Sequence, residues 1–125
     1  MKRLLAFAAA LTFVVCSGCG DSHESLTGES LSTMKELVSV LDGVKDEASA
    51  KSAKPKLKSL MEKLKDINQR QSKLPAPTDA QVKAMDAKYG KQMEEISQKL
   101  QSQMLRIAFD PKIRGQLDDI NLKGP

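Results

Sequence analysis

The sequence has 125 residues, a length typical of one small domain. Aromatic residues make up only 3% of it, Trp is absent, and the formal net charge is +4. A positive balance this weak does not by itself indicate a nucleic-acid or membrane-surface partner. A core with so few aromatics must be built from Leu, Ile, Val, Met and Ala, which favours packed helices over a sheet.

The first 18 residues have the layout of a secretory signal. Lys2 and Arg3 precede an apolar run, residues 4–15, that only Thr12 interrupts, and small or polar residues follow. The run is shorter than the roughly 20 apolar residues that a membrane-spanning helix needs. We therefore expect residues 1–18 to be a cleaved signal peptide. Its removal leaves 107 residues and lowers the net charge to +2.

The end of this segment resembles the lipobox of bacterial lipoprotein precursors. In that family a cysteine preceded by small residues is lipidated on sulfur and becomes the new N-terminus. The resemblance implies lipidation of Cys19, preceded by Ser17 and Gly18, whereas Cys16 departs from the Leu usually found in its place. Gly20 after the lipidated cysteine implies retention at the outer membrane. Cleavage by an ordinary signal peptidase, an uncleaved anchor and a strained disulfide between the two cysteines are the alternatives.

The expected location is therefore the cell envelope, with the exported chain anchored by lipid and facing the periplasm or the cell surface. Residues 19–30 are rich in Gly, Ser and acidic groups, which predicts a lipidated N-terminus followed by a tether. Residues 31–125 form the predicted helical domain.

Helical spacing of apolar residues from Leu31 predicts a first helix over about residues 30–50, with a possible bend at Gly43. The small and polar residues 48–55 predict the first reversal, because Pro55 is tolerated in a helix only within its first turn. Ser52 is the expected N-cap of the second helix.

The second helix carries a heptad seam, with apolar residues at positions 57, 60, 64 and 67. The prolines at 75 and 77 end it. Thr78 and Gln81 then predict a capping box that opens the longest helix, over about residues 79–108. Its apolar positions are 82, 85, 89, 93, 96, 100, 104 and 107. Gly90 is the weak point of this helix, and close packing against Gly43 is one explanation for it.

Asp110 and Pro111 predict the cap and first residue of a final helix. Its apolar residues Ile113, Leu117 and Ile120 share one face, which can fold over the open end of the bundle. The predicted fold class is all-α: an antiparallel three-helix bundle or extended coiled coil with a short C-terminal helix. We expect a capped monomer, with a self-associating module as the alternative, and charge pairing between the acidic first helix and the basic second one.

No residue pattern indicates catalysis or a metal site. His23 is the only histidine and lies in the predicted tether, so no serine has a plausible base. Adjacent Glu94 and Glu95 point about 100° apart on a helix and do not share a proton. The methionines lie on apolar faces, where gap filling is a simpler explanation than copper binding. We expect a non-enzymatic protein with no cofactor, no nucleic-acid partner and no small-molecule substrate.

Two functions remain. The leading one is a membrane-anchored module that binds a protein partner or itself, or that has a structural role in the envelope. The alternative is an electrostatic binder of anionic envelope polymer or lipid headgroups. The lysines that would make those contacts are Lys51, Lys54, Lys56, Lys58, Lys63 and Lys65. The helical part also resembles small uncharacterised planctomycete lipoproteins, in its layout and over residues 46–55, but this resemblance implies no activity.

Overall fold

The computed structural model describes residues 20–120, and its regular elements are all helical, which confirms the all-α fold class. The predicted signal peptide, residues 1–18, and Cys19 lie outside the described residues. The elements in chain order are α1 (His23–Asp42), α2 (Glu47–Ser72), α3 (Asp79–Met85), the π-helical turn η1 (Asp86–Gly90), α4 (Lys91–Phe109) and α5 (Pro111–Leu117). Within residues 20–120, no helix is both long enough and apolar enough to span a bilayer.

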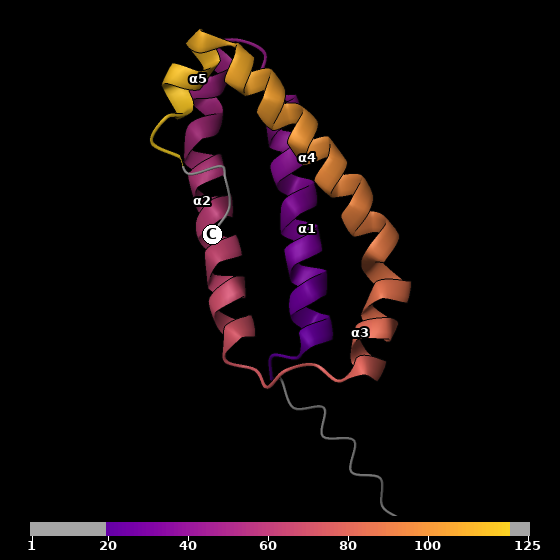
Figure 1. Cartoon of the computed structure of the whole chain (residues 1–125). Helices are drawn as coiled ribbons and strands as arrows, with labels where there is room; N and C mark the ends of the chain where they lie inside the picture. Colours follow the sequence, from indigo (N-terminus) through magenta and orange to yellow (C-terminus); the bar gives the residue numbers. More distant parts are fainter. Residues whose placement is uncertain (1–19, 121–125) are drawn as a thin grey trace, which may run out of the picture.

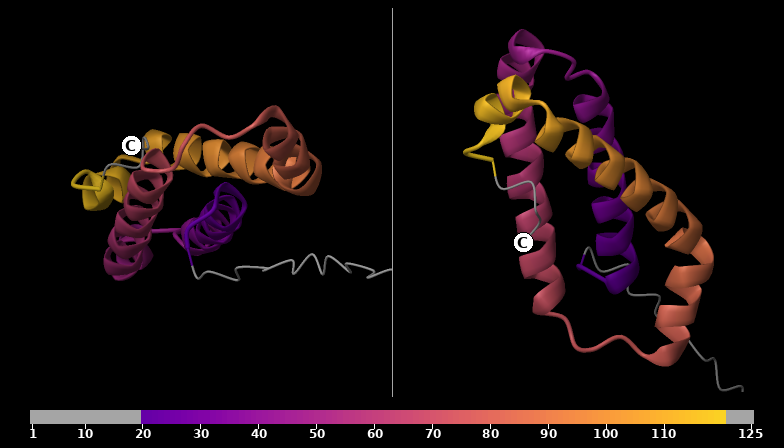
Figure 2. Two further views of the ribbon diagram at one scale, coloured as in Figure 1. Left: turned by 90° about the horizontal axis from the view of Figure 1, so that it is seen from below. Right: turned by 45° about the horizontal axis from the view of Figure 1, so that its top comes forward.

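Helix α1 is the centre of the arrangement, with α2 on one side and the arm formed by α3, η1 and α4 on the other (Figure 1). The arm and α2 converge at the end where α5 lies and diverge toward the end where residues 73–78 connect them. Figure 2 shows the same arrangement from two further directions, with α4 crossing obliquely over α1. The molecule is therefore an open antiparallel bundle, in which α2 and α4 both pack on α1 and α5.

The first helix begins earlier than the sequence suggested. Ser22 is its N-cap, and its hydroxyl accepts a hydrogen bond from the Ser25 amide while the Ser25 hydroxyl bonds the Ser22 backbone. The prediction of a tether over residues 19–30 is thus wrong from His23 onward. The composition misled because Gly, Ser and acidic residues are common in linkers and equally common in first helical turns.

The first reversal also lies earlier than predicted. Helix α1 ends at Asp42, Gly43 is its C-cap, and Asp46 caps α2 by accepting a bond from the Ser49 amide at 2.7 Å. Pro55 therefore stands in the interior of α2 rather than in its first turn. A proline removes the bond to the carbonyl four residues back. Because Pro55 is exposed, water can solvate that carbonyl, so the strong cap at Asp46 decides the boundary.

The predicted long helix over residues 79–108 is interrupted by the π-helical turn η1. The capping box of Thr78 and Gln81 is confirmed. The apolar steps from Met85 to Tyr89 and on to Met93 are both four residues, a spacing that a wide π turn accommodates. Gly90 does not meet Gly43. A Cβ at position 90 would lie 2.5 Å from Asp86 Oδ1, so the glycine leaves room for that carboxylate.

Two clusters of buried side chains hold the helices together. The larger lies between α1, α2, α4 and α5 and consists of Leu37, Leu41, Val44, Ala50, Leu57, Leu60, Ile107, Ile113, Leu117 and Ile120. The smaller lies between α1 and α4 and consists of Leu31, Val38 and Ile96, with Met34, Tyr89, Met93 and Leu100 packed against it. All members come from residues 31–120, so the described helices form their own core.

The C-terminal helix caps the bundle as predicted. Asp110 accepts backbone bonds from Lys112 and Ile113 at 3.0 and 3.2 Å, and Pro111 occupies the first turn. Ile113, Leu117 and Ile120 are buried against the end of α2 that carries Leu57 and Leu60. Val82, by contrast, was expected on the apolar face of the third helix and is 47% exposed, because α3 lies where the arm diverges from α2.

The position of the core yields a stability prediction. Leu41 is fully buried, so Leu41→Ala leaves a cavity and should lower the free energy of unfolding by about 2–5 kcal/mol. Phe109 is 83% exposed, so Phe109→Ala should change it by less than about 0.5 kcal/mol despite removing a larger side chain. Urea unfolding followed by circular dichroism measures both. Equal effects of the two substitutions would show that the core is misplaced.

Candidate functional site

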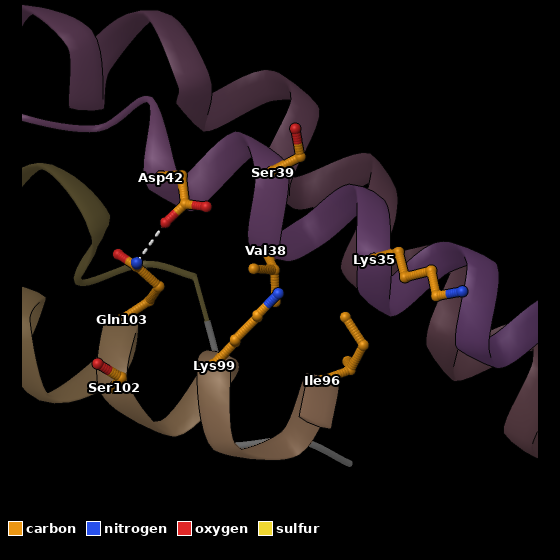
Figure 3. A pocket seen from close by; sticks show the side chains of 8 residues that line it. All are labelled: Lys35, Val38, Ser39, Asp42, Ile96, Lys99, Ser102 and Gln103. Carbon is orange, nitrogen blue, oxygen red and sulfur yellow. Dashed lines mark hydrogen bonds between the residues drawn. The ribbon is translucent and has the colours of Figure 1, made fainter. Parts of the chain in front are cut away.

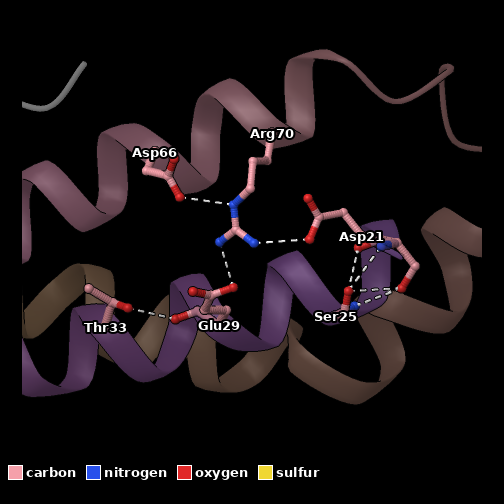
Figure 4. Close-up of polar contacts among 7 residues, drawn as sticks. Asp21, Ser25, Glu29, Thr33, Asp66 and Arg70 are labelled. Carbon is pink, nitrogen blue, oxygen red and sulfur yellow. Dashed lines mark hydrogen bonds and ion pairs between the residues drawn. The ribbon is translucent and has the colours of Figure 1, made fainter. Parts of the chain in front are cut away.

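The predicted lipidation residue, Cys19, lies just outside the described chain, but the residues after it are well anchored. Arg70, near the end of α2, donates to Asp21 at 2.9 Å and to Glu29 of α1 at 2.7 Å (Figure 4). Its Nε lies 2.9 Å from Asp66 Oδ2. Glu29 first, then the carboxylates of Asp21 and Asp66, raise the pKa of Arg70 above its usual value. One guanidinium thus ties the N-terminal segment to both helices.

His23 belongs to the same end of the molecule. Its Nε2 donates to the Pro75 carbonyl at 2.6 Å, which joins the first turn of α1 to the connection between α2 and α3. The lone histidine therefore has a structural contact in a helix, rather than lying in a tether as predicted. This end, where α1 starts and residues 73–78 cross, forms the base of the bundle (Figure 1).

The six candidate lysines do not form one patch. Because successive helical residues turn by about 100°, Lys51, Lys54, Lys58 and Lys65 lie along one edge of α2, whereas Lys56 and Lys63 lie on another. Lys54 and Lys58 each lie 2.6 Å from a carboxylate oxygen of Asp119, just after α5. Lys56 pairs with Glu36 of α1.

These pairs confirm the charge pairing expected between α1 and α2, and they add a second set between α2 and the end of α5. The ammonium of Lys56, and more weakly that of Lys63, lowers the pKa of Glu36. The two ammonium groups of Lys54 and Lys58 lower the pKa of Asp119 to about 2. Three of the six lysines thus lie in ion pairs within the molecule, with Lys54 and Lys58 sharing one carboxylate.

A groove of about 410 Å³ runs between α1 and α4 (Figure 3). Val38 and Ile96 form its apolar floor, and Gln103 donates to Asp42 across one end. Lys35 and Lys99 contribute the cations, but Lys35 is held by Gln92 at 2.6 Å. Neither Ser39 nor Ser102, which also line the groove, has a hydrogen bond to a base among the described residues. The groove offers contact surface and no arrangement for nucleophilic chemistry.

Arg106 of α4 bonds backbone carbonyls at the C-terminal end of α1. Its guanidinium donates to the Val44 carbonyl at 2.6 Å and the Leu41 carbonyl at 2.8 Å, and Gln103 holds it in place at 2.7 Å. The last carbonyls of a helix have no partner within it and carry partial negative charge, which a cation neutralises. Sequence patterns did not single out Arg106, because nothing local marks a side chain that bonds a distant helix end.

One side of α4 carries apolar, small and polar side chains and is only partly covered, and sequence reasoning predicted only Met104 of it, as part of the apolar stripe. We call it the outer flank, and it comprises Ser97, Gln101, Met104, Leu105 and Ala108. Together with Leu100 these residues line a groove of about 400 Å³. Leu105 is 53% exposed, and Phe109 at the end of α4 is 83% exposed. The sequence signal that was available is that Leu105 and Phe109 are apolar but fall outside the helical spacing of positions 96, 100 and 107.

The outer flank remains open although the predicted cap is in place. Helix α5 covers the end of the larger cluster, not this side of α4. Apolar surface that a folded protein leaves exposed in one place is a frequent mark of a binding site. Of the surfaces described, the outer flank is therefore the best candidate for function.

No group of three or more His, Cys, Asp and Glu side chains among residues 20–120 is placed to hold a metal ion. A scan against protein-family models matches none, and neither the curated proteins nor the solved structures contain a significant match to this chain.

The first prediction from this geometry concerns pH. Asp119 has a pKa of about 2 in the folded chain, against about 3.9 when unfolded, so its ionised form favours folding. This contribution is complete above about pH 5 and is largely lost as the pH falls to about 2. We expect the melting temperature of Asp119→Asn to be lower than that of the parent at pH 7 and close to it at pH 2, as measured by thermal unfolding across this range. Asp118→Asn, the matched control, should follow the parent throughout.

The second prediction concerns the end of α1. Arg106→Met keeps most of the side-chain stem but removes the guanidinium donor from the Val44 and Leu41 carbonyls, of which Leu41 keeps a bond from the Val44 amide. It should lower the free energy of unfolding by about 1 kcal/mol. Arg106→Lys should recover part of the loss. Slowed or unchanged amide exchange at residues 40–44 in the methionine variant would contradict this role.

Proposed function

We propose that the protein is a lipid-anchored helical module of the bacterial cell envelope that binds another protein chain and performs no catalysis. The observation that supports binding most directly is the outer flank of α4. Leu105 is exposed there and Phe109 is exposed at the adjoining end of α4, in a bundle whose own C-terminal helix already covers the main core. The anchor is inferred from the resemblance of residues 16–19 to a lipobox.

The two parts of the proposal fit together geometrically. With lipid on Cys19, only Gly20, Asp21 and Ser22 separate the membrane from α1, and Arg70 holds Asp21. The base of the bundle then lies close to the lipid headgroups. Helix α1 is 20 residues long, about 30 Å at 1.5 Å per residue, and it directs the α4–α5 end away from the membrane. The exposed side chains Leu105 and Phe109 would thus face a partner rather than the bilayer.

Electrostatic binding of an anionic polymer is the weaker reading. Its six lysines divide between two edges of α2, and Lys54, Lys56 and Lys58 pair with carboxylates of the same chain. An anion would have to compete with those pairs. Binding of this kind would also fall steeply between low and moderate salt, because dissolved ions screen attraction between exposed charges. Contact through an apolar flank would change little with salt.

The anchor is tested by the mass of the protein extracted from membranes of the native host. We expect a chain that begins at Cys19 and carries acyl groups. Cys19→Ala should leave the protein unlipidated, because sulfur is the acceptor. A mature N-terminus at another residue, or a mass without acyl chains, would contradict the proposal.

The binding surface is tested with a photo-crosslinking amino acid at position 105 in intact cells. Position 82 on α3 is the matched control, since Val82 is similarly exposed, at 47% against 53% for Leu105. We expect a discrete protein adduct from position 105 that persists in moderate salt, and much less from position 82. Equal labelling at the two positions would exclude the outer flank as the binding site.

A further inference from the structure

The segment that joins Cys19 to the base of the bundle is short and held in place. At most about 7 Å of extended chain separates Cys19 from Asp21, and the Asp21 carboxylate accepts a bond from Arg70 at 2.9 Å. Arg70 also bonds Glu29 of α1 and lies against Asp66 of α2, so both helices fix its position (Figure 4). A lipid on Cys19 is therefore joined to the base with little slack.

The connection between α2 and α3 lies at the same end as this segment. His23, two residues after Asp21, bonds the Pro75 carbonyl at 2.6 Å, which holds the connection beside the start of α1. In Figure 1 the connection crosses below the first turn of α1. Residues 75–77 are exposed, and residues 74–78 carry no charge. A surface that covers this loop therefore dehydrates no charged side chain of it, which is the costliest part of such a contact.

Charge does not attract the base to an anionic surface. Residues 20–30 and 66–90 together contain six carboxylates and only four Lys and Arg side chains. Lys88 of η1 already pairs with Glu24 at 2.5 Å. The lysine edges of α2 are the cationic surface, and the exposed Ser59 lies between them. Contact through the base thus depends on the anchor, whereas contact through α2 depends on anionic lipid.

We propose that residues 74–78 are the surface that contacts the bilayer: lipid on Cys19 holds this connection against the headgroups, with α1 directed away from the membrane. The inference rests on the proposed function, since it names the lipid-contacting surface of the anchored module. Contact stays at headgroup depth, because the irregular backbone of the connection needs water for its amides and carbonyls. The anchor keeps the local concentration of lipid high, so a surface with little affinity of its own stays in contact.

The test uses residues 19–125, whose described helices form their own core and in which Cys19 is the only cysteine and Trp is absent. Coupling Cys19 to a maleimide lipid supplies the anchor in phosphatidylcholine vesicles, with and without phosphatidylglycerol. Single tryptophans replace Ala76, Ser59 or Phe109, and lipid spin-labelled on its headgroup quenches the fluorescence of those near the surface. All three positions are exposed, so the preference of Trp for membrane interfaces acts on each alike.

We expect the strongest quenching at position 76 in both kinds of vesicle. Phe109 lies at the other end of α1, about 30 Å away, so Ala76→Trp should be quenched about threefold more than Phe109→Trp. Ser59→Trp should resemble Phe109→Trp. Residues 20–125, which lack the anchor, should show no quenching at position 76. Circular dichroism checks that each variant keeps the helicity of the parent.

Three results would overturn the proposal. Equal quenching at the three positions would show that the bundle turns freely on its anchor. Quenching that is strongest at position 59 in the anionic vesicles would assign membrane contact to the lysines of α2. Quenching at position 76 that is as strong without the anchor would show that the anchor does not hold the base. Because the lipid is coupled chemically, each of these results leaves the native anchor and the outer flank of α4 to their own tests.

Discussion

The fold depends on the width of the apolar face of α1. Buried residues cover about half of its circumference: Leu37 and Leu41 turn toward α2 and α5, and Leu31 and Val38 turn toward α4. A face this wide is too broad for one neighbouring helix, so α1 supports one on each side. The two outer helices need not then cover one another, and the bundle stays open toward its base (Figure 1). Burial of this face contributes hydrophobic stabilisation on both sides of α1, and polar contacts set the positions of the helix ends.

Those polar contacts join residues that are far apart in the sequence, and a few side chains make most of them. Arg106 bonds the end of α1 from α4, Arg70 joins α2 to the start of α1, and Asp119 ties the end of the chain to Lys54 and Lys58. Each joins two elements that the apolar clusters already bring together. An exposed ion pair contributes little free energy, but one made only in the correct register favours that register over others. Because Lys54 and Lys58 already pair with Asp119, they are poor candidates for binding a polyanion.

The sequence predicted those features that local chemistry determines. The caps at Thr78 and Asp110, the face shared by Ile113, Leu117 and Ile120, and the all-helical class follow from spacing and side-chain type. Prediction failed where two local signals competed. Asp46 and Ser49 form a stronger boundary than Pro55, and exposure makes the proline tolerable within α2. The turn η1 and the bond from Arg106 to Leu41 depend on packing between distant segments, which no short window contains.

The outer flank was hard to recognise for a related reason. Periodicity selects the strongest stripe on a helix, and in α4 the inner stripe of Ile96, Leu100 and Ile107 is the more apolar. The outer flank, with Ser97, Gln101 and Ala108, is weak in hydrophobicity and becomes apparent only once the neighbours of α4 are known. Its mixed composition suits a surface that must remain soluble before it is covered. A strongly apolar flank would promote indiscriminate aggregation, whereas the polar side chains of Ser97 and Gln101 limit the apolar surface that this one exposes.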